Sequence, residues 1–128
     1  MEFNYDDKRR CEIIGIPYPV VYSGGCCNFK GLTLDKLSLL LDEGFADPEE
    51  QQNSAPDTME FKSFLEKYPQ VTLHGYMVSP ERDDYRMSIE GLEYNGAVSR
   101  EMLDDFIAMF RFADEFEFEN DYLYCWFD

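Results

Sequence analysis

The last fifteen residues of the chain alternate in a way that few structures accommodate. They read DEFEFENDYLYCWFD, residues 114–128, and acidic and apolar residues alternate just before Asn120-Asp121. A period of two is typical of a β-strand with one buried face. Asn and Asp tolerate the positive φ of a two-residue turn. The segment therefore predicts a β-hairpin whose apolar face closes a sheet against helices.

The position of the turn decides which side chains share a face of this hairpin. The predicted outer pairs are Glu115 with Trp126, Glu117 with Tyr124 and Glu119 with Tyr122, and the inner pairs are Phe116 with Cys125 and Phe118 with Leu123. We expect the four inner residues to be buried and the three glutamates to be exposed, since only one face of the ribbon is covered.

The outer face allows two interpretations. In the structural one, the Tyr and Trp rings shield the strand backbone while the glutamates keep an exposed strand soluble. In the functional one, the face binds a partner, because Tyr and Trp are common interface anchors and neighbouring carboxylates select Arg or Lys. The candidate partner-binding residues are Glu115, Glu117, Glu119, Tyr122, Tyr124 and Trp126.

Size and charge limit the class of protein. A chain of 128 residues with 45% apolar residues predicts one folded domain, residues 1–128. Residues 1–32 carry four acids and four bases, so the whole net charge of −16 belongs to an acidic body, residues 33–128. Such a charge repels nucleic acid and attracts basic proteins. We therefore expect no direct binding to nucleic acid.

The compartment is inferred from what the sequence lacks. The first residues, MEFNYDDKRRCEII, hold charges where a secretory signal would be apolar, and no stretch approaches the length of a membrane span. These features predict a cytoplasmic protein with no membrane association. Its four cysteines, Cys11, Cys26, Cys27 and Cys125, are then expected to be free thiols.

Residues 1–32 read as an irregular or β segment. The run CEIIGIPYPVVY, residues 11–22, has β-branched residues interrupted by Gly15, Pro17 and Pro19, which suits an edge strand. The following run, SGGCCNFKG, residues 23–31, reads as a loop.

Three helices are predicted after this segment. Their expected N-caps are Thr33, Asp57 and Ser99, each of which precedes a stripe of apolar residues at helical spacing. Glu60 lies three residues after Asp57, which is capping-box spacing. Gly44 and Pro69 are expected to end the first two helices.

Two further strands are predicted between the second and third helices. QVTLHGYMV, residues 70–78, and DYRMSIE, residues 84–90, alternate with a period of two. The apolar parity changes after Ile89, so Gly91 is a candidate bulge. Together with the hairpin, these elements predict an α+β fold: an antiparallel sheet of about four to five strands with roughly three helices packed mainly on one face.

Catalytic and metal-binding motifs are missing from the sequence. The single histidine, His74, has no nucleophile motif around it, and the cysteine spacing does not match a zinc site. We assign no catalytic residue, no metal ligand and no cofactor.

Three functional hypotheses remain. The favoured one is a small, non-enzymatic interaction protein whose acidic face engages a basic protein surface, with mimicry of nucleic acid as its most specific form. The first alternative is a small enzyme or ligand-binding domain with a pocket near His74 and the loop Ser23–Asn28. The second is a structural subunit that forms a homodimer through its Tyr and Trp side chains.

Overall fold

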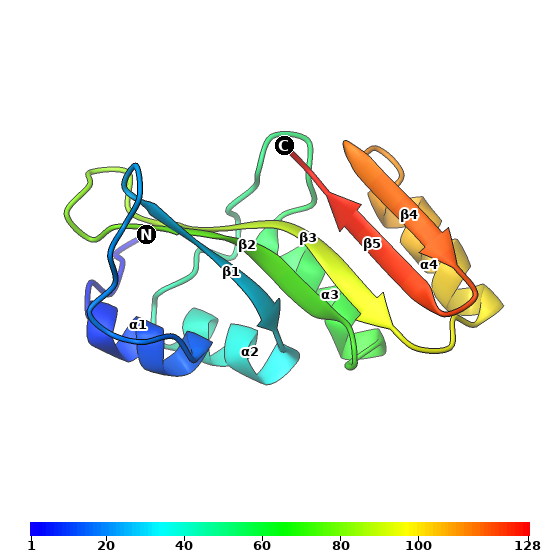
Figure 1. Ribbon diagram of the computed structural model, residues 1–128, viewed down its shortest axis with the longest axis horizontal. Helices are drawn as coiled ribbons and strands as arrows, with labels where there is room; N and C mark the ends of the chain where they lie inside the picture. The colour runs from blue at the N-terminus through cyan, green and yellow to red at the C-terminus, as the bar shows by residue number, and fades with distance from the viewer.

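A computed structural model describes residues 1–128 and shows an α+β fold. Four helices accompany one antiparallel sheet of five strands in the order β1-β2-β3-β5-β4 (Figure 1). The helices are α1 (Asp7–Ile14), α2 (Leu34–Asp42), α3 (Thr58–Lys67) and α4 (Arg100–Phe110); the strands are β1 (Cys26–Leu32), β2 (Thr72–Val78), β3 (Met87–Asn95), β4 (Glu115–Glu119) and β5 (Tyr122–Trp126). The predicted fold class is confirmed.

The three predicted helices begin at their predicted caps. The side chains of Thr33, Asp57 and Ser99 each accept a hydrogen bond from a backbone N–H in the first turn. Asp57 and Glu60 form the reciprocal capping box. These local bonds satisfy donors that a helix leaves free at its N-terminus, which is why the sequence alone located the helix starts.

The centre of the sheet carries a bulge one residue before the predicted position, Gly91. His74 pairs with Gly91 and Gly75 pairs with Ile89, so Glu90 is an extra residue in β3. The parity change in the sequence is the consequence, because one inserted residue turns the following side chains to the opposite face. Leu92 is thereby returned to the buried side, and Glu93 lies on the other face.

The prediction for the first third was wrong in two places. Residues 7–14 form helix α1 and not an irregular or β segment; Asp6 caps it and Gly15, at φ +90°, ends it. The supposed loop of residues 23–31 contains most of strand β1, which pairs with β2. Both elements depend on distant partners: Arg10 of α1 donates a hydrogen bond to the carbonyl oxygen of Val78, at 2.8 Å.

The hairpin has the predicted register and exposed glutamates, but only two of the four inner residues are buried. Every predicted pair is observed, from Glu115 with Trp126 to Glu119 with Tyr122. Leu123 and Cys125 are fully buried, whereas Phe116 is half-buried and Phe118 is 47% exposed. The reason is that β4 is an edge strand: Phe106 of α4 stacks on Phe116 at 4.8 Å between ring centroids, and Phe118 makes its aromatic contact only with Phe116.

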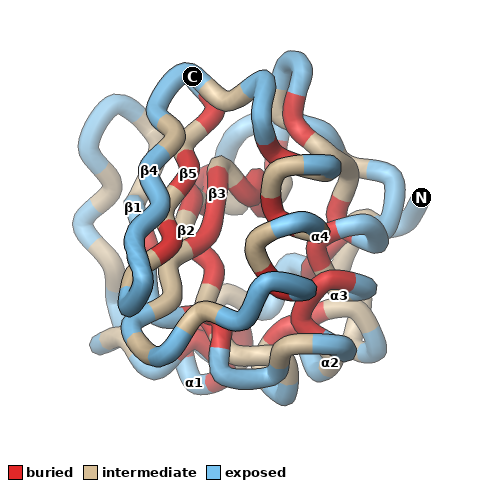
Figure 2. The backbone as a smooth tube through the Cα atoms, turned by 90° about the vertical axis from the view of Figure 1, so that its right-hand side faces the viewer, coloured by how far each residue is buried: buried red, intermediate tan, exposed pale blue.

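The helices lie on one side of the sheet, so one sheet face is left without a helical layer (Figure 1). A single core of buried apolar side chains lies between the sheet and the helices. Figure 2 shows buried residues in both layers. Residues 1–32 pack onto this body: the Asn4 backbone N–H donates to the Gly44 carbonyl oxygen, and Arg10 is fully buried. None of the four helices has both the length and the apolarity needed to cross a bilayer.

Candidate functional site

The face of the sheet opposite the helices carries a cluster of acids and aromatics at the β3-β5-β4 end. We call it the acidic–aromatic face; its members are Glu90, Glu93, Glu115, Glu117, Glu119, Tyr122, Tyr124 and Trp126. The antiparallel register places Glu93 and Glu117 on either side of Tyr124, so the aromatic row lies between two acidic strands. All six residues predicted as partner-binding lie together on this face.

The three glutamates of β4 have no internal partner. Glu115, Glu117 and Glu119 are exposed, and their carboxylates form neither an ion pair nor a hydrogen bond. From Phe112 to Asp128 the chain holds six acids and no base. Other acids of the protein do pair, as Glu43 does with Arg9 at 2.7 Å. The negative charge of the hairpin is therefore uncompensated.

Two of the aromatic residues are held in place by the glutamates of β3. The Tyr122 hydroxyl donates to Glu93 Oε2 at 3.1 Å, and Trp126 Nε1 donates to Glu90 Oε2 at 3.3 Å. Burial and the bond to Glu93 raise the pKa of Tyr122 to about 12. Burial raises the pKa of Glu90, although the Trp126 bond opposes this. The half-buried rings of Tyr122 and Trp126 therefore have fixed orientations.

His74 extends the aromatic row toward β2. Its ring stacks on Tyr124 with centroids 5.4 Å apart and an interplanar angle of 14°, and Tyr124 lies parallel to Tyr122 at 6.5 Å. The ring passes over Gly91, and Nε2 donates to the Cys125 carbonyl oxygen at 3.0 Å. Burial lowers the pKa of His74, and the nearby carboxylates Glu93 and Glu115 partly oppose this. His74 is thus a neutral donor that ties three strands together.

The residues expected to form one pocket in the ligand-binding alternative lie at two separate hollows. His74 borders a hollow of about 440 Å³ with Lys30, Thr72, Glu93 and Tyr124. The loop Ser23–Asn28 contributes only Gly25 to another hollow, of about 530 Å³, and no residue lines both. The residues named for this alternative therefore do not enclose a single pocket.

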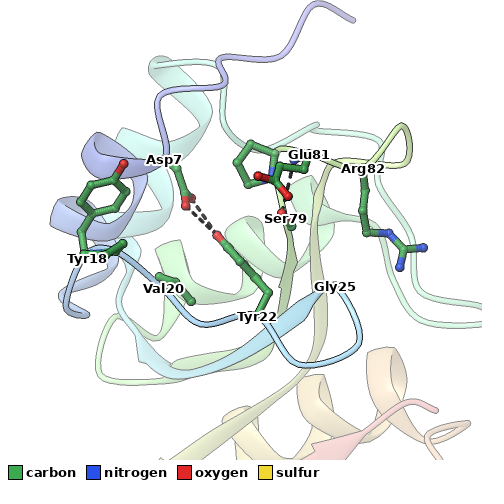
Figure 3. Close-up of a pocket in the computed structure, with 10 residues that line it drawn as sticks. Asp7, Tyr18, Val20, Tyr22, Gly25, Ser79, Glu81 and Arg82 are labelled. Atoms are coloured by element: carbon green, nitrogen blue, oxygen red, sulfur yellow. Dashed lines mark hydrogen bonds between the residues drawn. The ribbon is translucent and has the colours of Figure 1, made fainter.

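The second hollow is lined by Asp7 and Tyr22, two members of a polar network (Figure 3). The Tyr22 hydroxyl donates to the Asp7 carboxylate at 2.8 Å, and Arg10 pairs with the same carboxylate at 3.0 Å. Arg10 also lies over the Tyr85 ring at 4.5 Å. Burial and the bond to Asp7 raise the pKa of Tyr22 above its usual value. These contacts anchor α1 to the sheet, so the network has a structural role.

Sequence reasoning missed Glu90, Glu93 and His74 as neighbours of the hairpin face. The parity change after Ile89 carried the necessary signal for Glu93, because a bulge before Leu92 turns Glu93 away from the core. No local signal indicated that β3 pairs with β5, since pairing between distant strands is decided by the whole sheet.

The protein has no cluster of potential metal ligands. The structure has no group of three or more His, Cys, Asp or Glu side chains that could hold a metal ion. Its four cysteines are free; Cys11 and Cys125 are buried, while Cys26 and Cys27 are half-buried. Burial raises the pKa of Cys11 to about 11 and that of Cys125 to about 12, so neither buried thiol is activated.

Comparison with known proteins adds no relative. No protein-family model matches the chain, no curated protein matches it, and no solved structure matches its fold.

Proposed function

We propose that this protein is a non-enzymatic interaction domain that engages a basic protein surface through its acidic–aromatic face. The observation that carries the proposal is the row formed by Glu115, Glu117 and Glu119, three exposed carboxylates that nothing within the protein neutralises. Unpaired acids also occur elsewhere on the surface, but on β4 three of them occupy alternate positions of one strand beside an aromatic row.

The aromatic row supports the same proposal. Tyr122, Tyr124 and Trp126 are half-buried, and hydrogen bonds or ring stacking hold each of them in a fixed orientation. Rings that are already ordered lose little conformational entropy when a partner binds. Tyr and Trp faces also accept Lys and Arg side chains through cation–π contacts. A basic partner is therefore matched both in charge and in the type of contact.

The most specific form of the proposal is mimicry of nucleic acid. Alternate residues of a strand are about 6.8 Å apart, so the three glutamates form a straight row of evenly spaced negative charges. A phosphate backbone is also a regular row of negative charges. In this form, the partner is a protein that binds DNA or RNA, and this domain competes for the same basic groove.

The test uses matched charge variants of the whole protein. The hairpin variant carries Glu115→Gln, Glu117→Gln and Glu119→Gln. The control variant, Glu2→Gln, Asp42→Asn and Asp83→Asn, removes the same charge at exposed positions outside the face that form no ion pair. Both variants and the wild type serve as baits in a lysate of the source cells at low and high salt. We expect the hairpin variant alone to lose a basic partner.

Kinetics with the purified partner then decide the proposal. The hairpin variant should associate more slowly and show a weaker dependence on salt, because charge acts mainly on the encounter. Trp126→Ala should act on dissociation and weaken binding by about 2 kcal/mol if the ring is an anchor. If the hairpin variant binds with the wild-type rate and salt dependence, the proposal is wrong. Competition with labelled DNA or RNA for the partner tests mimicry.

A further inference from the structure

The outer edge of β4 offers backbone groups that no other part of the protein uses. A two-residue turn makes its flanking pair, Glu119 and Tyr122, a hydrogen-bonded pair, and such pairs then alternate along the hairpin. The backbone groups of the three glutamates therefore point toward β5. Those of Phe116 and Phe118 point outward, and no backbone hydrogen bond outside the regular elements involves either residue.

The edge is also accessible and regular. β4 is the last strand of the sheet, its five pairs follow one another without a bulge, and most of its length is exposed (Figure 2). On the helix side, the Phe118 ring is 47% exposed beside Phe116. A strand added at this edge would use two donors and two acceptors and would cover an apolar ring at the same time.

Charge selects the kind of strand that fits. A second copy of β4 would place glutamates opposite glutamates, which is unfavourable for residues that face each other across strands. A strand with Lys or Arg at alternate positions would instead place its cations opposite Glu115, Glu117 and Glu119. Its intervening residues would lie on the helix side, where an apolar side chain covers Phe118.

We propose that β4 accepts an additional β-strand from a basic partner, with the pattern basic-apolar-basic-apolar-basic. The inference rests on the proposed function and specifies how that face is engaged: the partner extends the sheet at its acidic edge. Recognition then requires the order of the partner's residues as well as its charge, because one face of the added strand must be basic and the other apolar.

The test uses two peptides of equal charge and composition. The alternating peptide is acetyl-Thr-Lys-Val-Lys-Val-Lys-Thr-amide, and the scrambled one is acetyl-Thr-Lys-Lys-Val-Val-Lys-Thr-amide. We expect the wild-type protein, labelled with nitrogen-15, to bind the alternating peptide about tenfold more tightly. Only this peptide should slow hydrogen exchange at the Phe116 and Phe118 amides, whereas the Glu117 amide, already paired with β5, should change little.

Two variants at one position separate the backbone from the ring. Phe118→Pro removes the outward N–H without removing a bond to β5, and proline is tolerated at such edge positions. Phe118→Ala removes the ring but keeps the N–H. We expect Phe118→Pro to weaken binding of the alternating peptide about tenfold and Phe118→Ala to weaken it about threefold. Nitrogen-15 spectra of both variants verify that the sheet is intact.

The outcomes distinguish this inference from the proposed function. If both peptides bind equally and the hairpin variant with three Gln residues binds neither, the face attracts basic partners but adds no strand, and only the inference is overturned. If neither peptide binds at low salt, both are overturned. Concentration-dependent protection of the two amides without peptide would show that a second copy occupies the edge, and this also overturns the inference. The hydrogen-exchange measurement on the wild-type protein still tests the inference if the Phe118→Pro variant does not fold.

Discussion

The two edges of the sheet are protected in different ways. At the β1 edge, the register breaks between Phe29 and Leu32, where Gly31 has φ +67°, and Lys30 is exposed. The start of β1 is closed by a tight turn, because Cys26 exchanges two backbone hydrogen bonds with Ser23. The β4 edge has no bulge, no proline and no lysine, and its three exposed glutamates are its main protection.

This difference has a consequence for binding. A bulge or a turn disrupts the row of backbone groups, so it blocks any incoming strand. A row of like charges repels copies of itself but attracts a strand of opposite charge. The β1 edge is therefore poorly suited to pairing with an added strand, whereas under our proposal the β4 edge repels a second copy of itself and accepts a basic strand.

The pairing of β3 with β5, which carries the hairpin, depends on Gly91. A Cβ atom at this position would lie 1.9 Å from the Cys125 carbonyl oxygen and 2.9 Å from His74 Cε1. We expect Gly91→Ala to lower the free energy of unfolding by at least about 3 kcal/mol, because backbone atoms of β3 and β5 must separate. Urea unfolding measures the effect.

A glycine at the opposite edge provides the control. Gly31 has a positive φ but no atom within 4 Å of a built Cβ. Gly31→Ala should therefore cost only about 1 kcal/mol, the strain of a left-handed alanine. Equal losses for the two variants would contradict the assignment of Gly91 as the point where the hairpin is attached.

Truncation of the apolar side chains of β4 should lower stability more at Phe116 than at Phe118. Phe116 stacks on Phe106, whereas Phe118 is 47% exposed. We expect Phe116→Ala to lower the free energy of unfolding by about 2 kcal/mol and Phe118→Ala by about 0.5 kcal/mol or less, because only the former removes a contact with the helical layer. Thermal unfolding compares the two. A larger loss for Phe118→Ala would mean that its ring packs in solution.

His74 should make the stability of the protein depend on pH. Its pKa in the folded state is lowered by burial, so the unfolded chain, with a pKa of about 6.5, binds a proton more readily. His74 therefore makes stability fall as the pH drops below about 6.5 toward the folded-state pKa, with a slope of at most about 1.4 kcal/mol per pH unit. The carboxylates Glu93 and Glu115 limit this effect.

A variant isolates this histidine from the many carboxylates of the chain. His74→Asn removes the titration, so the stability difference between wild type and variant should shrink as the pH falls from 8 to 5.5. Urea unfolding at several pH values measures this difference. A difference that stays constant over the range would show that folding does not shift the pKa of His74.

The smallest change in stability should come from the charges that protect the β4 edge. In the variant with Glu115, Glu117 and Glu119 replaced by Gln, relief of repulsion should raise the free energy of unfolding by about 0.5 kcal/mol or less at low salt. The same variant should self-associate more strongly than the wild type, since the edge has lost its negative charge. Sedimentation velocity detects the association.

The other edge supplies the matched control for this effect. Lys30→Gln removes an exposed charge of β1, but the bulge and the turn remain. This variant should sediment like the wild type. If it self-associates as readily as the Gln variant of β4, geometry does not protect the β1 edge, and the contrast between the two edges is wrong.

The hairpin register and three helix starts are encoded locally and could be predicted from the sequence. Asn120-Asp121 and the flanking alternation specified the hairpin register residue by residue, because a turn of fixed length leaves only one pairing that unites the apolar side chains. The caps at Thr33, Asp57 and Ser99 located three helix starts for a similar reason, since a cap bonds to a residue three positions away. The six candidate site residues came from the hairpin alone.

Features that depend on distant residues could not be predicted, because they are set by packing between elements. Helix α1 is eight residues long, too short to be stable alone, and Arg10 ties it to the carbonyl oxygen of Val78 in β2. The exposure of Phe118 follows from the position of β4 at the sheet edge, and the alternation of EFEFE cannot encode that position. Glu90 and Glu93 lie at the site because β3 pairs with β5, and this pairing depends on the packing of the whole sheet.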